Sequence, residues 1–314
     1  MDDIEVRELR FFVAVAEELN FSRAAERLGM AQPPLSRAIR QMERRLGVQL
    51  FERNTRQVTM TVAGQALLNE AGNAFDVLSA AVRRTRRAAL PTPTLVVTAK
   101  PGLATGLLKR IVTSYSALPG TPQVELVVSG YREQANMVRD GSADLALLSS
   151  PYDERGLAAE PLTTEPRVAA LPAGHELAGW GALRCRDLDG WPVPQWPDSS
   201  PVERRYWSGR DRDSSAKRSI EPPSDLPAHG PVVRDSTQLL EVVGLGQALA
   251  LIPLSLAERN PRADVVYRPV GDASPYTTVI VWPEGARAHS VALFVRAAIR
   301  TAHEDNEAYA AEVS

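Results

Sequence analysis

The stretch "AQPPLSRAIRQMERRLG", residues 31–47, has the spacing of an amphipathic helix, although two adjacent prolines stand at its start. Its apolar residues recur at intervals of four, three and four, and they are Leu35, Ile39, Met42 and Leu46. Proline is tolerated in the first turn of a helix, because the backbone N–H groups there have no intrahelical acceptor. Since the residue before a proline avoids the helical region, the sequence predicts extended backbone at Gln32 and a helix that begins at Pro33 or Pro34.

Two shorter helices are predicted before this stretch. The segment "VRELRFFVAVAEEL" (residues 6–19) has apolar side chains at helical spacing, and "FSRAAERLG" (residues 21–29) follows it as a second helix. Ser22 is placed to cap the second helix, and Gly29 is placed to end it. We therefore expect three helices joined by short turns before residue 48.

Arginine is concentrated in this part of the chain. Residues 20–60 contain eight arginines against three glutamates, although the whole chain of 314 residues has a net charge of −2. Arg37, Arg40 and Arg44 lie off the apolar stripe of the third helix. The chain has only three lysines, so the preference for arginine is not informative, whereas its clustering is. A basic patch in an otherwise acidic chain indicates a polyanionic partner.

A hairpin and a long helix are predicted next. Residues 48–61 have strand-like ends around the polar tip "ERNTRQ", which predicts a short β-hairpin. Thr61 is placed to cap a helix over residues 62–90. The apolar positions of this helix follow a 3, 4, 3, 4 spacing, and they are Leu68, Ala71, Phe75, Leu78 and Val82. Such a seam favours a partner helix from a second chain; the alternative is packing on its own domain.

The pattern changes from residue 94 onward. Short apolar runs such as "TLVVTA" and "VELVVSG" alternate with helical patterns, which predicts an α/β region over residues 94–305 with a mostly parallel sheet. Residues 208–230 are polar and rich in serine, proline and charge, so we expect a mobile surface loop there.

Several classes of protein are disfavoured. Cys185 is the only cysteine, so no intrachain disulfide can form, which fits a reducing compartment. We see no secretory signal and no apolar stretch of membrane-spanning length, so we expect a cytoplasmic protein. Nucleotide-binding, hydrolase and metal motifs are missing, and the four histidines lack ligand spacing. We therefore expect no catalytic residue, no cofactor and no metal.

The chain resembles a LysR-type transcriptional regulator over nearly its whole length. The resemblance rests on residues 9–64, "LRFFVAVAEELNFSRAAERLGMAQPPLSRAIRQMERRLGVQLFERNTRQVTMTVAG", followed in the family's order by "GSADLALL", "LPAGHELAG" and "GLGQALALIP". It implies an α/β protein with an N-terminal winged helix-turn-helix over residues 1–61 and a linker or dimerisation helix over residues 62–90. Residues 94–305 then resemble a periplasmic binding protein with two subdomains. Subdomain one is expected over about 94–160 and 264–305, and subdomain two over about 161–263.

The resemblance also implies a set of DNA-contacting residues. The matching positions are Gln32, Pro33, Pro34, Ser36, Arg37 and Arg40 on the third helix, Ser22 and Arg23 on the second, and Arg53, Thr55 and Arg56 at the hairpin tip. Gln32 suits adenine, and Arg37 or Arg40 suits guanine. Ala31 departs from the serine usual in the family, so one cap or phosphate contact is in doubt.

An effector cleft is implied between the subdomains. The matching positions are Thr98, Ala99, Lys100, Pro101, Ser129, Gly130, Tyr131, Arg132, Ser149, Gln195, Trp196, Asp235 and Ser236. Family members often have serine or threonine where this chain has Lys100 and Arg132, and both would lie beside helix N-termini. This favours an anion such as a carboxylate. The alternative is that both side chains point to solvent or pair with acidic residues.

The predicted function is that of a sequence-specific, DNA-binding transcriptional regulator that responds to a small-molecule effector. It would bind an imperfect inverted repeat in double-stranded DNA as a homodimer or homotetramer, with no membrane partner. The alternative is a small-molecule binding or assembly module with weak or non-specific DNA binding. The arginine cluster favours the regulator, because an assembly domain has no use for it.

Overall fold

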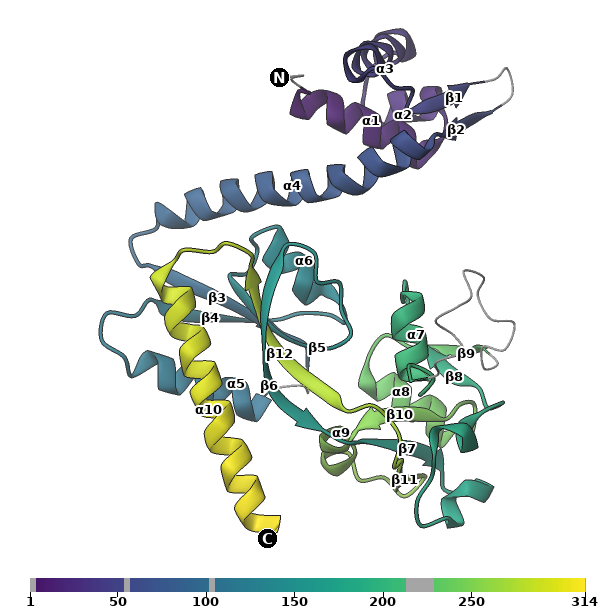
Figure 1. Cartoon of the computed structure of the whole chain (residues 1–314), viewed down its shortest axis with the longest axis vertical. Coiled ribbons are helices and arrows are strands. Elements are labelled where there is room, and N and C mark those ends of the chain that lie inside the picture. The colour runs from purple at the N-terminus through teal and green to yellow at the C-terminus, as the bar shows by residue number, and fades with distance from the viewer. Residues whose placement is uncertain (1–3, 54–56, 102–104, 213–228, 314) are drawn as a thin grey trace. The chain divides into compact units, whose positions relative to one another are not determined.

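The computed structural model describes residues 4–53, 57–101, 105–212 and 229–313 (Figure 1). The chain divides into two compact units, Met1–Val82 and Arg83–Ser314, and each is described by itself. Within the described ranges, no helix is both long and apolar enough to cross a lipid bilayer. No group of three histidine, cysteine or acidic side chains among these residues is placed to hold a metal ion.

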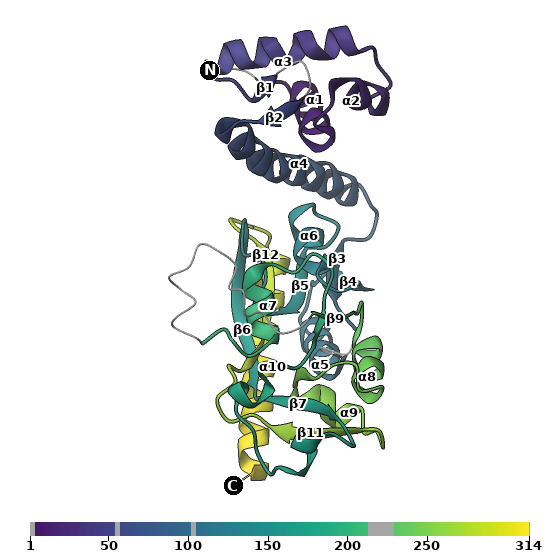
Figure 2. The ribbon, with the colours of Figure 1, turned by 90° about the vertical axis from the view of Figure 1, so that its right-hand side faces the viewer.

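The N-terminal unit is a three-helix core followed by a hairpin and the start of a long helix (Figure 2). Its elements are α1 (Val6–Glu18), α2 (Phe21–Arg27), α3 (Gln32–Leu46), β1 (Phe51–Arg53), β2 (Val58–Met60) and α4 (Val62–Ala88). The predicted apolar stripe of α3 faces this core: Leu35, Ile39 and Met42 are fully buried together with Phe12. Replacement of any of these residues by alanine would lower the free energy of unfolding by about 2–5 kcal/mol.

Helix α3 begins one residue earlier than predicted. Gln32 is its first residue and Ala31, with φ −74° and ψ 150°, is the N-cap without a side-chain cap. Pro33 and Pro34 still lie in the first turn, where a missing N–H costs no hydrogen bond. The expectation of extended backbone at Gln32 was therefore wrong, because the preference against helix before proline is a bias and not a prohibition; the extended residue is Ala31.

The cap of α2 also differs from the prediction. Asn20, not Ser22, is the N-cap, and its side-chain oxygen accepts from the N–H groups of Ser22 and Arg23 at 2.9 and 3.1 Å. The predicted end at Gly29 is confirmed. Its φ is +66°, and the turn is closed by hydrogen bonds from Gly29 N–H to Glu26 O and from Met30 N–H to Ala25 O. Glycine adopts this left-handed conformation without strain.

The start of α4 is held tightly against the hairpin. Thr61 caps the helix as predicted, because its hydroxyl accepts from Gly64 N–H at 3.0 Å. A Cβ on Gly64 would lie 2.2 Å from the Leu50 carbonyl oxygen, so only glycine fits there. Along α4, Leu68 packs on the core of the N-terminal unit, whereas Leu78 and Val82 remain 41% and 50% exposed. The N-terminal part of the predicted seam thus packs within its own domain, and the C-terminal part is exposed.

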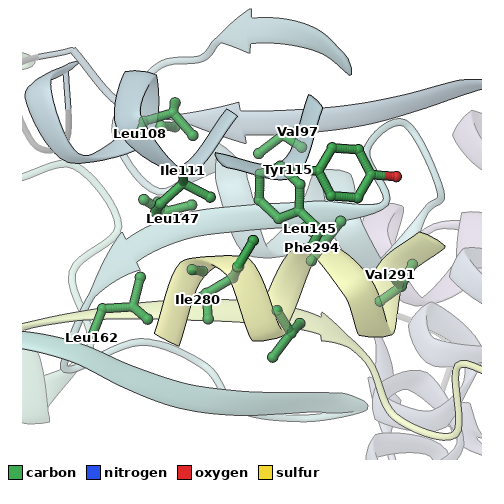
Figure 3. Packing of buried hydrophobic residues seen from close by; sticks show 14 of the residues in the cluster. Val97, Leu108, Ile111, Tyr115, Leu145, Leu147, Leu162, Ile280, Val291 and Phe294 are labelled. Carbon is green, nitrogen blue, oxygen red and sulfur yellow. The ribbon is translucent and has the colours of Figure 1, made fainter. Parts of the chain in front are cut away.

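The C-terminal unit contains two sheets. The larger has the order β4-β3-β5-β12-β6, in which β3 pairs in parallel with β4 and β5, and β12 pairs antiparallel with β5 and β6. The strands are β3 (Thr94–Ala99), β4 (Gln123–Val128), β5 (Leu145–Ser149), β6 (Leu157–Glu165) and β12 (Tyr276–Pro283). Helices α5 (Thr105–Ser116) and α10 (His289–Val313) pack on one face, where Tyr115 meets Phe294 (Figure 3). Helix α6 (Glu133–Arg139) packs on a separate apolar cluster of the same sheet.

The second sheet is antiparallel, with the order β10-β7-β11. Its strands are β7 (Arg167–Pro172), β10 (Ala250–Pro253) and β11 (Val265–Pro269); β8 (Val193–Gln195) and β9 (His229–Val232) form a separate parallel pair. Helices α7 (Pro201–Trp207), α8 (Ser236–Gly244) and α9 (Leu254–Arg259) and two short 3₁₀ turns, Glu176–Gly179 and Cys185–Leu188, complete this half. The expectation of a mostly parallel sheet was therefore wrong: this sheet is antiparallel, and two of the four strand pairings in the larger sheet are antiparallel as well.

The sheets place the subdomain boundaries later than the predicted 160 and 264. Strand β6 stays in the first sheet up to Glu165, and β11 pairs with β7 in the second. We therefore use subdomain one for residues 94–165 and 276–313, and subdomain two for residues 166–275. Of the predicted loop 208–230, residues 213–228 lie outside the described residues, and β9 already begins at His229.

Candidate functional site

The exposed side of α3 is basic. Gln32, Pro33, Arg37 and Arg40 are exposed, and Arg44 extends the same side by one turn. Arg37, Arg40 and Arg44 form no ion pair with any described residue, so their charges are available to a partner. Two predicted contacts are less accessible, because Pro34 is half-buried and Ser36 is only 8% exposed.

The start of α2 is less available to phosphate than predicted. The N–H groups of Ser22 and Arg23 donate to Asn20, so they are already used by the cap. The Arg23 guanidinium lies 3.4 Å from the Glu18 carboxylate and donates to the Glu18 carbonyl. Both side chains are exposed, so the Ser22 hydroxyl and part of the Arg23 guanidinium can still reach solvent.

The predicted contacts at the hairpin tip are only partly described. Arg53 is the last residue of β1, and Thr55 and Arg56 lie outside the described residues. The hairpin itself is confirmed, with Phe51 opposite Met60 and Arg53 opposite Val58.

A cleft of about 730 Å³ lies between subdomains one and two. Subdomain one contributes Lys100 after β3, the Gly130–Arg132 turn before α6, and Ser149 at the end of β5. A smaller apolar chamber of about 140 Å³ shares Lys100 and Tyr131 with this cleft. Nine of the predicted effector residues line one or both: Lys100, Pro101, Gly130, Tyr131, Arg132, Ser149, Trp196, Asp235 and Ser236.

Lys100 is a cation without a carboxylate partner among the described residues. Its Nζ donates to Ser149 Oγ at 3.4 Å and lies 5.3 and 5.7 Å from the ring centres of Tyr131 and Tyr276. Removal from water lowers the pKa of Lys100 from 10.5 to about 8, so the side chain is still mostly charged at pH 7. A desolvated ammonium group held by one hydroxyl is suited to bind an anion.

Arg132, the other predicted anion contact, is already paired. It forms an ion pair with Glu203 at 2.8 Å and donates to the carbonyl oxygens of Pro197, at 3.2 Å, and Asp198. The structure therefore agrees with the alternative stated above, in which Arg132 pairs with an acidic residue. Sequence reasoning did not identify Glu203, because it lies 71 positions away in the other subdomain.

Four predicted effector residues do not line the cleft. Thr98 is fully buried, and its hydroxyl shares a 2.7 Å hydrogen bond with Ser129, to which Gln134 also donates at 2.7 Å. Ala99 is buried, and Gln195 donates to the Val193 carbonyl within its own strand pair. Thr98 and Ser129 thus satisfy each other inside the fold and are not open to a ligand.

Sequence reasoning also missed aromatic and apolar residues of the smaller chamber. Trp207 at the end of α7 and Tyr276 at the start of β12 both line it, together with Leu239, Ile252 and Leu256. Burial raises the pKa of Tyr276, so its phenol stays protonated. The spacing of these residues predicts only core positions, and their meeting depends on how the two subdomains fold together.

A buried arginine links the two segments in which the chain passes from one subdomain to the other, between β6 and β7 and between β11 and β12. Arg167, 1% exposed at the β6–β7 crossing, donates from Nε to the Ser274 carbonyl at 2.6 Å, next to the start of β12. It also donates to the Tyr206 carbonyl at 2.6 Å and lies 3.9 Å from the ring centre of Tyr206. The crossings are thus tied to each other and to α7.

Cys185 lacks the properties of a redox or nucleophilic site. Burial and the nearby Asp272 carboxylate raise the pKa of its thiol to about 12, and the backbone N–H of Cys185 donates to Asp272 at 2.8 Å. The reactive species of cysteine is the thiolate, and a thiol with so high a pKa is scarcely ionised at neutral pH.

Comparisons with known proteins match both halves of the chain. Residues 6–65 match the model "Bacterial regulatory helix-turn-helix protein, lysR family", and residues 88–303 match "LysR substrate binding domain". The Hca operon transcriptional activator HcaR of Escherichia coli (strain K12) is 29% identical over 286 residues, covering 90% of this chain and 93% of HcaR. The HTH-type transcriptional regulator AlsR of Bacillus subtilis (strain 168) is 32% identical over 270 residues, covering 84% of this chain and 85% of AlsR.

Solved structures show the same fold. Full-length BenM aligns with a TM-score of 0.53 at 26% identity, covering 96% of this chain and 98% of BenM. Full-length CbnR in complex with its target DNA aligns with a TM-score of 0.54 at 22% identity, covering 95% of this chain and all of CbnR.

Proposed function

This chain is a member of the LysR family of bacterial DNA-binding transcriptional regulators, and it is not an enzyme; we propose that it recognises an imperfect inverted repeat as a homo-oligomer and responds to a small anionic effector. Such a regulator works in the cytoplasm, where its DNA is. Each half-site would be read by one α3 helix, because a two-fold protein matches a two-fold sequence.

The exposed basic side of α3 is the observation that carries the DNA-binding part of the proposal. Arg37 projects from the N-terminal half and Arg40 from the middle of a helix whose other side is buried, and no described carboxylate neutralises them. In this arrangement Arg37 or Arg40 can bind guanine through two hydrogen bonds, and Gln32 can do the same with adenine. Arg44 is further along the helix, where a phosphate contact is expected.

Oligomerisation is supported by the free part of the α4 seam. Leu78 and Val82 of the seam are 41% and 50% exposed, and the neighbouring Val77 is 65% exposed, which leaves an apolar surface without a partner among the described residues. Pairing of two α4 helices would cover it, and a dimer of such dimers gives a tetramer.

The effector part of the proposal rests on Lys100. A carboxylate in the cleft would gain a charge-assisted hydrogen bond from Nζ, and the apolar chamber beside it would accept the rest of the ligand. Binding between the subdomains would change their relation and thereby the spacing or bend of the bound DNA.

The alternative, an assembly module with weak DNA binding, predicts little salt dependence, and this separates the two proposals. Fluorescence anisotropy with a cognate duplex at increasing salt should give a steep slope, because each phosphate contact adds about 0.9 to the slope of log K against log salt. Arg44→Ala should lower this slope, whereas Arg10→Ala, an exposed arginine on α1, should leave it unchanged. A shallow slope that Arg44→Ala does not alter would support the assembly module.

A further inference from the structure

A contact across the cleft joins the two subdomains directly. Arg132 belongs to subdomain one, and all three of its acceptors belong to subdomain two: the carbonyl oxygens of Pro197 and Asp198 and the carboxylate of Glu203. Beside it, the rings of Tyr131 and Trp196 stack at 4.1 Å with an angle of 21° between their planes. The cleft is therefore spanned by both a polar and an aromatic contact.

The acceptors form a preorganised site for a guanidinium group. Glu203 is 4% exposed, and a reciprocal capping box fixes it, since Ser200 N–H donates to its carboxylate at 2.9 Å and Glu203 N–H donates to Ser200 Oγ at 3.2 Å. The two carbonyl oxygens lie on the other side of the Arg132 guanidinium and complete its set of acceptors. A planar cation with several N–H donors matches this geometry better than an ammonium group does.

The backbone on both sides of the contact is held in an unusual conformation. Among the described residues, only three that are not glycine have a positive φ, and two of them are Arg132, at +68°, and Asp198, at +55°. A left-handed backbone at such residues costs free energy and persists only where the surrounding contacts compensate for it. Here the two residues are the donor and one of the acceptors of the contact across the cleft.

We propose that subdomain two contains a guanidinium-binding site, formed by the Pro197 and Asp198 carbonyls and Glu203, and that Arg132 occupies it as a tethered ligand that closes the cleft before any effector arrives. An effector can therefore bind only to the fraction of molecules in which Arg132 has left this site. The affinity for the effector is reduced by that fraction, as for any ligand whose competent state is partly populated. Arg132 is unavailable to the effector anion in the closed state, whereas Lys100 still lines the cleft.

The test measures closure directly in the full-length chain. Spin labels are placed at Glu154→Cys in subdomain one and Val232→Cys in subdomain two, in a Cys185→Ser background, because Asp153 and Arg155 beside the first position and Arg234, two residues from the second, line the cleft. Labelled chains are diluted with unlabelled chains so that oligomers contain one pair, and the distance distribution is measured by pulsed electron double resonance. Arg132→Gly removes the tethered group, and glycine tolerates the positive φ at this position.

The parent protein should show one dominant short distance. In Arg132→Gly the ratio of short to long distances should fall about fivefold or more, and millimolar methylguanidinium should restore it while methylammonium does not. Glu203→Gln keeps an acceptor for Ser200 N–H but removes the charge, so it should also open the cleft and should abolish the rescue in the double variant. Arg259→Gln is the control, since this arginine lines the chamber but, among the residues that the structure describes, donates only to Ser255, within α9.

Two results would overturn the proposal. An unchanged distance distribution in Arg132→Gly would mean that the contact does not hold the cleft closed. Opening that methylguanidinium fails to reverse, or that methylammonium reverses equally well, would mean that no guanidinium-specific site exists in subdomain two.

Discussion

Lys100→Met should stabilise the protein while it removes the proposed anion site. In the folded state the pKa of Lys100 is about 8, against 10.5 for a free lysine, so the unfolded chain binds more protons between these two values. Stability therefore rises with pH across this window, and the full cost of holding the charged lysine is present below pH 8. One pKa unit corresponds to 1.36 kcal/mol, which sets an upper value of about 3 kcal/mol.

The partial exposure of Lys100 reduces this value, and we expect the methionine variant to gain about 1–3 kcal/mol at pH 7. Differential scanning calorimetry at equal protein concentrations should show a rise in Tm of about 2–4 °C for each kcal/mol. The gain should shrink between pH 8 and 10.5 and vanish above it, because there the native lysine is neutral as well. The same variant should lose the stabilisation that small monocarboxylates give to the parent protein.

Lys109→Met is the control for the loss of a lysine, since Lys109 is exposed on α5. It should change neither the pH profile nor the response to carboxylates. If Lys100→Met were less stable than the parent at pH 7, with the same pH profile, then Lys100 would have a compensating partner and would not be a cation held for a ligand.

The other predictions concern the crossings, the DNA surface and the seam. Arg167→Met should lower stability by about 3–5 kcal/mol, because it leaves the carbonyls of Ser274 and Tyr206 without their buried donor; thermal unfolding measures this, and a loss below 1 kcal/mol would contradict it. Arg40→Ala should weaken binding to a cognate duplex by about 1–3 kcal/mol in an anisotropy titration if it reads a base, and unchanged affinity would rule out that role. Leu78→Asp should shift the sedimentation coefficient towards the monomer, and an unchanged oligomer would mean that the exposed seam of α4 is not the interface.

The N-terminal fold could be predicted because its signals are local. The apolar stripe of α3 follows from residues three and four apart, and Gly29 ends α2 because glycine readily adopts a positive φ. The errors were also local and small. Asn20 took the cap that Ser22 was expected to provide, since either residue type can accept from the first N–H groups, and periodicity does not distinguish them.

The sequence predicts which residues each subdomain contributes to the cleft, but not which contacts form between the subdomains. Lys100 follows β3 and Ser149 is the last residue of β5, and these buried strands are neighbours in one sheet, so the approach of the two side chains follows from the strand pattern. The pairing of Arg132 with Glu203 depends instead on how two subdomains close, which no local spacing contains. The mutual hydrogen bond of Thr98 and Ser129 is a further example, because a polar residue at a strand end can face a ligand or a buried neighbour with the same sequence pattern.

The central claim is tested most directly by selecting bound duplexes from a random pool with the purified full-length protein, followed by salt titration of the selected sequence. The account predicts an enriched inverted repeat with half-sites at a fixed spacing and a steep loss of affinity with salt. Enrichment of no dyad, with weak binding that is the same for selected and random duplexes, would contradict it.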